Sequence, residues 1–153
     1  MNAEKRLQDL KIHLPSAPKP AGNYVPYVVT GNLIFLAGTI CMIEGKMSHT
    51  GATGEAHTVN SAYEAARVCA LNSLALLKEA AGDLDRIKRI VSVSGFVNAV
   101  PGFTESPQVI NGASDLFADV FGEAGKHARA AVAVGGLPLN STVEIQVVAE
   151  LDE

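Results

Sequence analysis

Several residue types that support small or extracellular proteins are scarce in this chain. Of its 153 residues none is tryptophan, and the aromatic side chains are five phenylalanines and three tyrosines. A core with so few aromatics has to be built from Ala, Val, Leu and Ile. The two cysteines are too few and too unpatterned for a disulfide framework or a zinc site. Cys69 stands in an apolar helical run, so we expect it to be a small core residue.

Positive charge and long apolar runs are also lacking. The formal net charge is −4, and no block of Lys and Arg stands free of acidic residues, which argues against a nucleic-acid partner. No run reaches about 18 apolar residues, the length that crosses a membrane. Charges throughout the first 20 residues leave no apolar segment for a signal peptide. We therefore expect a soluble, cytoplasmic protein.

Motifs for metals and cofactors are missing as well. The four histidines, at positions 13, 49, 57 and 127, have no metal-ligand spacing to one another or to the cysteines. The glycines form neither a phosphate loop nor a dinucleotide fingerprint. The expectation is that the protein uses no metal and no cofactor.

The remaining composition, with 48% hydrophobic and 18% charged residues, is typical of a globular protein. The length favours a single domain over residues 1–153, with residues 1–22 as an N-terminal helix and a Pro-rich arm. The helix is expected from Ala3 to Ile12. Two β-rich runs follow in residues 23–40. Gly31 and Asn32 between them predict a hairpin.

Apolar periodicity predicts most of the remaining elements. Residues 44–54 are polar and Gly-rich and indicate a loop, with room for one edge strand. The strongest helix pattern runs from His57 to Gly82, where Gly82 supplies the end. Its predicted buried face comprises Ala62, Ala66, Ala70, Leu74, Leu77 and Ala81.

The second half of the chain alternates strands with one more helix. Residues 86–100 predict a central strand. A second helix follows, capped by Ser106 with Pro107 at its first position. Its apolar face would be formed by Val109, Ala113, Leu116 and Val120.

Two last strands are expected at about 128–134 and 142–151. The pattern predicts an α+β fold in which two helices cover one face of one sheet. The other face would be bare and apolar, so we expect association through it, in a cyclic oligomer.

Two charged residues, Arg129 and Glu144, stand within these last two strands. Charged residues are rarely fully buried unless they are paired. If the strands are antiparallel neighbours, the two side chains could form a cross-strand ion pair of little net stability. Alternatively, Arg129 presents its planar fork to a substrate carboxylate, and Glu144 acts beside it as a base or holds a water. The pattern alone leaves both interpretations open.

Two distant segments resemble one known family. The C-terminal signature consists of Ala128-Arg129-Ala130, Val132, Val134, Gly135, Leu137 and Val143-Glu144-Ile145. The early segment GNYVPYVVTGNLIFLAG is similar to the family's Gly-x-Tyr stretch followed by Gly-Asn and Ser-Gly. On these motifs the chain resembles the RidA/YjgF family, also called endoribonuclease L-PSP. Its arm is similar to a subgroup with a longer N-terminus.

The resemblance implies a chorismate-mutase-like fold and a homotrimer, with a central barrel and clefts between subunits. It implies hydrolysis of reactive 2-imino or enamino acids to 2-oxo acids and ammonia, without metal or cofactor. By resemblance, Arg129 would bind the substrate carboxylate and Glu144 would position the attacking water. Tyr24 and Asn111 would line the cleft, and Gly38 would keep its floor open.

The sequence departs from the family pattern at three cleft positions. Ala37 stands where the family has serine, Ala131 where cysteine is frequent, and His127 where proline is frequent. Two polar groups are thus replaced by methyl groups, which predicts a cleft that prefers substrates with apolar side chains. The alternatives are a non-catalytic or regulatory binder of small carboxylates and, less favoured by the acidic balance, an endoribonuclease.

Overall fold

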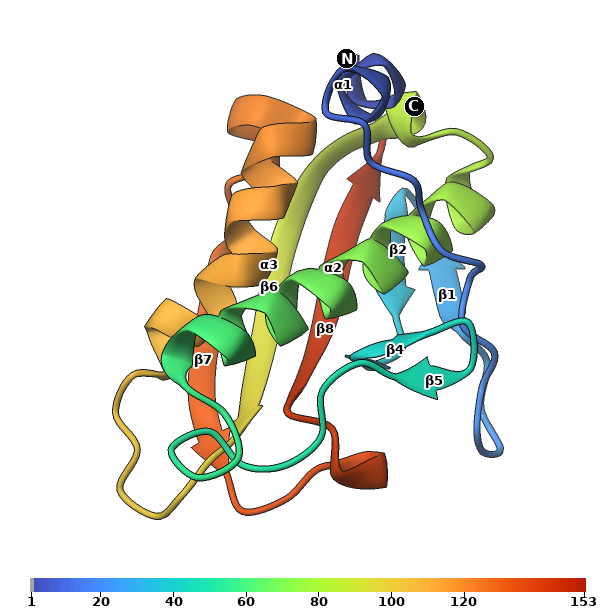
Figure 1. Cartoon of the computed structure of the whole chain (residues 1–153). Coiled ribbons are helices and arrows are strands. Elements are labelled where there is room, and N and C mark those ends of the chain that lie inside the picture. Colours follow the sequence, from blue (N-terminus) through green and yellow to red (C-terminus); the bar gives the residue numbers. More distant parts are fainter. Residues whose placement is uncertain (1) are drawn as a thin grey trace.

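The computed structural model describes residues 2–153 and places a six-strand sheet behind two long helices (Figure 1). The helices and strands, in chain order, are α1 (Ala3–Asp9), β1 (Tyr27–Thr30), β2 (Leu33–Leu36), β3 (Thr39–Ile40), β4 (Met42–Ile43), β5 (Lys46–Met47), α2 (Val59–Ala81), β6 (Ile87–Asn98), α3 (Ser106–Phe121), β7 (Ala128–Val134) and β8 (Val143–Leu151).

The sheet has the order β1-β2-β8-β6-β7, and β3 adds a short pairing to β8. Every pair is antiparallel except β6 with β7, which run parallel. Helix α3 connects these two parallel strands, and α2 lies beside it across the same face of the sheet (Figure 1). The predicted α+β class is therefore confirmed.

The first hairpin forms where the sequence predicts it. Thr30 pairs with Leu33, so Gly31 and Asn32 are the two turn residues. Gly31 has a φ of 59°, a left-handed conformation that glycine adopts without a steric penalty. This hairpin sets the alternation that buries Ile34 and Leu36 and turns Phe35 to the opposite face.

Helix α2 also agrees with its pattern. The Thr58 hydroxyl accepts a hydrogen bond from the Ser61 amide at the N-terminus, and Gly82 ends the helix with a φ of 85°. All members of the predicted apolar face are buried, namely Ala62, Ala66, Ala70, Leu74, Leu77 and Ala81. The alanines allow the helix to approach the sheet closely, and the Cys69 thiol, which is buried as expected, donates to the carbonyl of Val143 on β8.

Helix α3 differs from its prediction at the N-terminus. Glu105 is the capping residue and makes no side-chain cap, while Ser106 is already within the helix and is buried. The predicted cap by Ser106 is therefore wrong by one residue. The apolar face is as predicted, with Val109, Ala113, Leu116 and Val120 buried. Helix α3 passes so close to α2 that a methyl group on Gly112 would collide with the carbonyl of Tyr63.

One other boundary also differs. The N-terminal helix stops at Asp9, short of the expected Ile12, and Lys11 adopts a positive φ of 56°. The polar segment 44–54 contains one short strand, as the sequence allowed, because β5 pairs with β4 in a small separate hairpin. Among residues 2–153 no helix is long and apolar enough to span a bilayer.

The face of the sheet away from the helices carries exposed apolar side chains. On this face Val28 is 51% exposed, Phe35 is 42% exposed and Val132 is 46% exposed. Val28 is paired with Phe35 across β1 and β2, and Val132 is paired with Phe96 across β7 and β6. Several large apolar side chains exposed on one face are typical of interaction surfaces.

Candidate functional site

Arg129 lies on the edge strand β7, and its half-buried side chain points toward the helices. Its Nη1 donates to the Ser114 hydroxyl at 3.0 Å, and its Nη2 donates to the Pro107 carbonyl at 3.0 Å. Both acceptors belong to α3, so the helix determines where the guanidinium lies. The salt bridges of residues 2–153 are Lys5–Asp9, Lys78–Glu4 and Lys126–Glu123, which leaves Arg129 without an acidic partner there.

His127 extends this polar cluster. Its Nε2 lies 2.9 Å from the Ser114 hydroxyl, and its Nδ1 lies 2.7 Å from the Gly125 carbonyl. Burial, supplemented by the nearby charge of Arg129, lowers the pKa of His127 despite its bond to Gly125. The imidazole is therefore biased toward its neutral form.

These side chains line a hollow of about 320 Å³ between α3 and the start of β7. That volume falls at the small end of the usual range for ligand pockets. Its lining residues are Asn111, Ser114, Asp115, Ala118, Lys126, His127 and Arg129. The structure thus brings Asn111 and Arg129 together in one hollow, whose lining also carries one further basic residue, Lys126, and one acidic residue, Asp115.

Glu144 lies on β8, and its side chain points to the opposite face of the sheet. Its neighbours along the strand, Val143 and Ile145, are fully buried under the helices, so the alternation of the strand turns Glu144 the other way. Its carboxylate lies directly over Gly38, where any side chain would collide with Glu144. Burial raises the pKa of this carboxyl group. We expected the missing side chain of Gly38 to leave the cleft floor open. The carboxylate of Glu144 fills that space instead.

Arg129 and Glu144 do not meet within one chain. Strand β6 lies between β7 and β8, with Arg129 opposite Val93 and Glu144 opposite Phe96. Strand spacing of about 4.8 Å and a rise of about 3.3 Å per residue put their Cα atoms roughly 14 Å apart. The two side chains also point to opposite faces. The expectation of neighbouring antiparallel strands was wrong, and so was a cross-strand ion pair within the chain.

The remaining predicted site residues divide between the same two regions. Tyr24 is 52% exposed and precedes β1, which is the sheet edge opposite to β7. Ala37 follows β2, beside Gly38, and its amide donates to the carbonyl of Pro26. Ala131 is on β7 but packs against the hydrophobic core and does not line the hollow of Arg129. The two alanines therefore do not shape one pocket within a single chain.

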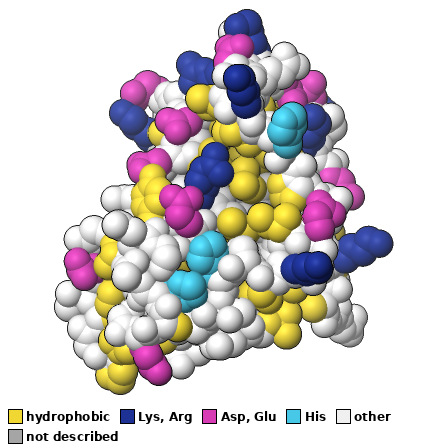
Figure 2. Space-filling view, in the orientation of Figure 1, with side chains coloured by type: hydrophobic (Ala, Val, Ile, Leu, Met, Phe, Trp, Pro, Cys, Tyr) yellow, Lys and Arg dark blue, Asp and Glu magenta, His cyan; other side chains and the backbone are white. Residues whose placement is uncertain are grey.

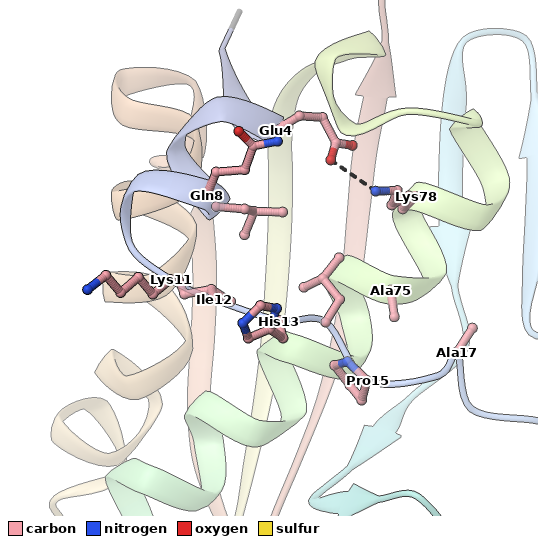
Figure 3. Close-up of a pocket in the computed structure, with 11 residues that line it drawn as sticks. Glu4, Gln8, Lys11, Ile12, His13, Pro15, Ala17, Ala75 and Lys78 are labelled. Atoms are coloured by element: carbon pink, nitrogen blue, oxygen red, sulfur yellow. Dashed lines mark hydrogen bonds and ion pairs between the residues drawn. The ribbon is translucent and has the colours of Figure 1, made fainter.

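A larger hollow lies elsewhere, between the N-terminal segment and α2 (Figure 3). It measures about 740 Å³, and Figure 3 shows Glu4 bonded to Lys78 at its upper edge. Leu7, Ile12 and Leu14 supply much of its apolar lining. It contains none of the predicted site residues, so volume alone would have pointed to a different site.

Charged side chains show no concentration of one sign on the helix-covered face. Figure 2 shows basic and acidic residues intermingled there, with an apolar strip between them. This distribution agrees with the net charge of −4. An electrostatic surface for a nucleic-acid backbone would need clustered basic residues.

Ser114 was not predicted as a site residue, although it contacts both Arg129 and His127. The available signal was its spacing: Ser114 follows Asn111 by three residues, which places both on one side of a helix. Lys126 was missed because a lone lysine between a helix and a strand has no distinguishing pattern. His127 was noted only as a departure from proline, without a role.

Comparison with known proteins agrees with the fold and the motifs. Residues 4–151 match the family described as "YjgF/chorismate mutase-like, putative endoribonuclease". The chain is 46% identical to protein TCP17 of Trypanosoma cruzi, over 95% of this chain and 92% of that protein. It is 30% identical to a RutC family protein of Pyrococcus horikoshii, over 90% of this chain and 94% of that protein.

Solved structures give the same result. A protein of unknown function from Agrobacterium tumefaciens superposes with a TM-score of 0.91 at 47% identity, covering 98% of this chain and 92% of that one. An endoribonuclease-like protein from Shewanella oneidensis superposes with a TM-score of 0.94 at 38% identity, covering 97% and 99%. The chain therefore belongs to the YjgF/RutC/RidA family and has its α+β, chorismate-mutase-like fold.

Proposed function

We propose that the protein hydrolyses reactive 2-imino or enamino acids to 2-oxo acids and ammonia, in clefts between the subunits of a homotrimer. Arg129 of one subunit holds the substrate carboxylate, and Glu144 of another activates the water. The observation that carries this proposal is the separation of the two residues. Because they lie on opposite faces of one sheet, they can act on one small ligand most simply when two chains meet.

The surfaces available for such a meeting are suited to it. Glu144 lies on the face that carries the exposed side chains of Phe35 and Val132, which favours burial against another chain. Arg129 lies on the edge strand beside that face. Tyr24, near the opposite edge, would line the cleft from the same side as Glu144.

The reaction requires little beyond orientation. Water adds to the imine carbon and forms a C–O bond, and the imine nitrogen takes up a proton. The amino group of the carbinolamine then takes up a proton and leaves as ammonia when the C–N bond breaks, while the hydroxyl loses its proton and becomes the carbonyl of the 2-oxo acid. An imine is already electrophilic, so holding its carboxylate and one water in register supplies most of the acceleration.

Glu144 has the properties of the group that would accept a proton from that water. Burial raises the pKa of this carboxyl group, which makes its carboxylate a stronger base than that of an exposed glutamate. Among residues 2–153 it has no cationic partner within salt-bridge distance. Its lone pairs therefore remain free for water.

Two substitutions test the roles. Imines are generated in situ from amino acids by a dehydratase or an amino-acid oxidase, and release of ammonia or 2-oxo acid is followed. Glu144→Gln should retain binding of a 2-oxo acid but lose turnover by about a hundredfold or more. Arg129→Lys keeps the charge and loses the planar fork, so ligand affinity should fall at least about tenfold.

The same experiment distinguishes imine hydrolysis from the main alternative function, which is carboxylate binding without turnover. A carboxylate-binding protein without turnover is favoured by one observation: Arg129 and Asn111 line one hollow within a single chain, without Glu144. In that case the Arg129 variant would lose binding while neither the parent nor the Glu144 variant would accelerate hydrolysis. Unchanged binding by Arg129→Lys would contradict both functions.

The name of the family also raises ribonuclease activity. Incubation of the purified protein with single-stranded RNA tests it directly, and the intermingled surface charges predict no cleavage above background (Figure 2). Cleavage that Glu144→Gln abolishes would replace the deaminase proposal.

A further inference from the structure

The proton positions in the Arg129 cluster follow from the acceptors present. The Gly125 carbonyl can only accept, so Nδ1 of His127, 2.7 Å away, carries the hydrogen. In the neutral ring Nε2 is then an acceptor, and the Ser114 hydroxyl donates to it across 2.9 Å. The remaining lone pairs of that hydroxyl face Nη1 of Arg129, which donates across 3.0 Å. The result is one directed chain from Arg129 through Ser114 and His127 to the backbone.

Other charged groups around the histidine are already engaged. Asp115 accepts from the Tyr63 hydroxyl at 2.6 Å, and Lys126 pairs with Glu123 at 2.8 Å. The edge of Phe117 packs against the imidazole ring, with the ring centroids 5.9 Å apart. His127 is therefore held by Ser114, Gly125 and Phe117, and within residues 2–153 no carboxylate hydrogen-bonds to its ring to favour the protonated form.

The guanidinium is fixed at two points and free at the others. An arginine side chain has five N–H groups in a rigid plane. One on Nη1 is bonded to Ser114 and one on Nη2 to Pro107, both on α3. These two hydrogen bonds orient the guanidinium plane, and three N–H groups remain for a ligand. A carboxylate needs two of them for a bidentate contact.

We propose that Ser114 and His127 are positioning residues that orient the Arg129 guanidinium for a ligand carboxylate. His127 directs the Ser114 hydroxyl, and the hydroxyl oxygen holds Nη1. This inference rests on the proposed role of Arg129 in binding. It adds the residues that fix the orientation of the Arg129 side chain, so that an arginine on an edge strand can bind a carboxylate in one geometry.

Ser114 and His127 also resemble a nucleophile and its base, and the contact with Arg129 distinguishes that role from positioning. A serine hydroxyl that donates to a histidine, itself oriented by an acceptor, is also the arrangement of a nucleophile and its base. Here Arg129 donates to the serine oxygen, and a hydrogen bond from a cation draws electron density away from that oxygen and makes it a poorer nucleophile. The contact therefore favours positioning over nucleophilic catalysis.

The first test uses nuclear magnetic resonance on the full-length protein labelled with ¹⁵N. At pH 7.5 the His127 ring should be neutral with the hydrogen on Nδ1. The Nη signals of Arg129 should show slowed rotation, which Ser114→Ala should abolish and Ser114→Thr should restore. Fast rotation in the parent, or a hydrogen on Nε2 of His127, would overturn the chain.

The second test measures binding of pyruvate by calorimetry. Ser114→Ala should weaken binding by about tenfold, as expected for loss of a hydrogen bond to a charged group. His127→Gln should weaken it by about threefold, and Ser114→Thr should stay within about twofold of the parent. His13→Gln, at an exposed histidine outside this hollow, is the matched control and should have no effect.

The outcomes separate this inference from the proposed function. If Arg129→Lys loses pyruvate while Ser114→Ala and His127→Gln bind it like the parent, the positioning roles are wrong and the receptor role of Arg129 stands. If Arg129→Lys also binds like the parent, the proposed function fails. Covalent labelling of Ser114 by a fluorophosphonate would identify a nucleophile instead and would overturn the positioning role.

Discussion

At the scale of single residues, the two charged groups of the site are held in opposite ways. Arg129 is tied to α3 through two hydrogen bonds, so its position is set before any ligand arrives. Glu144 is half-buried, and burial alone accounts for its raised pKa. The folded chain thus favours the protonated form of Glu144, and the native state loses stabilisation when that carboxyl ionises.

This predicts how stability depends on pH at Glu144. Because the folded pKa exceeds the unfolded value, the stabilising effect is complete below the ordinary pKa of about 4.3 and is lost as pH rises through the folded value. Glu144→Gln resembles the protonated form, so its free energy of unfolding should exceed that of the parent at pH 7. The two should converge below about pH 4.

Urea denaturation at pH 4 and pH 7, at one protein concentration, measures this difference. Glu79→Gln is a suitable control, because it makes the same chemical change at an exposed glutamate of α2. If the parent protein and Glu144→Gln have the same free energy of unfolding at pH 7, burial of the ionised carboxylate does not destabilise the fold, and the prediction is wrong.

At the scale of helices and strands, the packing of α2 against α3 determines where the Arg129 hollow lies. Gly112 stands at their closest approach, where an added methyl group would meet the backbone of Tyr63. A backbone atom cannot rotate away as a side chain can. The helices would have to separate, and with them Asn111 and Ser114, which lie on the same helix.

Gly112→Ala should therefore destabilise the protein by about 1–3 kcal/mol, the usual cost of overpacking. Chemical denaturation measures the change. The matched control is Gly136→Ala in the loop before β8, where an added methyl group meets no atom within 4 Å and the backbone is not left-handed. Equal effects of the two substitutions would exclude the helix contact as the cause.

The elements also show which parts of the fold a sequence can predict. The buried face of α2 and the Gly31-Asn32 hairpin were predicted because they depend on residues close in the chain. The insertion of β6 between β7 and β8 was missed because strand order depends on distant pairings, such as Val93 with Arg129. The same limit applies to the site: motifs identified Arg129 and Glu144, but periodicity cannot tell that the sheet separates them.

At the scale of the whole molecule, the two faces of the sheet differ in how much apolar surface they expose. Phe35 and Val132 lie exposed on the face away from the helices, while the helices bury the other face. We propose that three chains associate through this face and form the central barrel implied by the family. Apolar burial at the resulting interfaces would supply the stability of the assembly.

Sedimentation at micromolar concentration should therefore find a trimer. Val132→Asp should dissociate it, because the substitution places a charge in an apolar interface. Leu10→Asp is the matched control, since Leu10 is 47% exposed against 46% for Val132 but lies in the N-terminal segment. A stable monomer of the parent protein would refute the assembly, as would equal dissociation by both variants.

The placement of Arg129 and Glu144 on opposite faces has a genetic consequence if each cleft takes one residue from each of two chains. A chain defective at Arg129 and a chain defective at Glu144 would each be inactive alone, yet mixed trimers would contain some clefts with both residues intact. Random mixing in equal amounts would restore about a quarter of the clefts, given a symmetric ring. Two harmful alleles could then complement each other within one cell, without recombination and without any change in sequence.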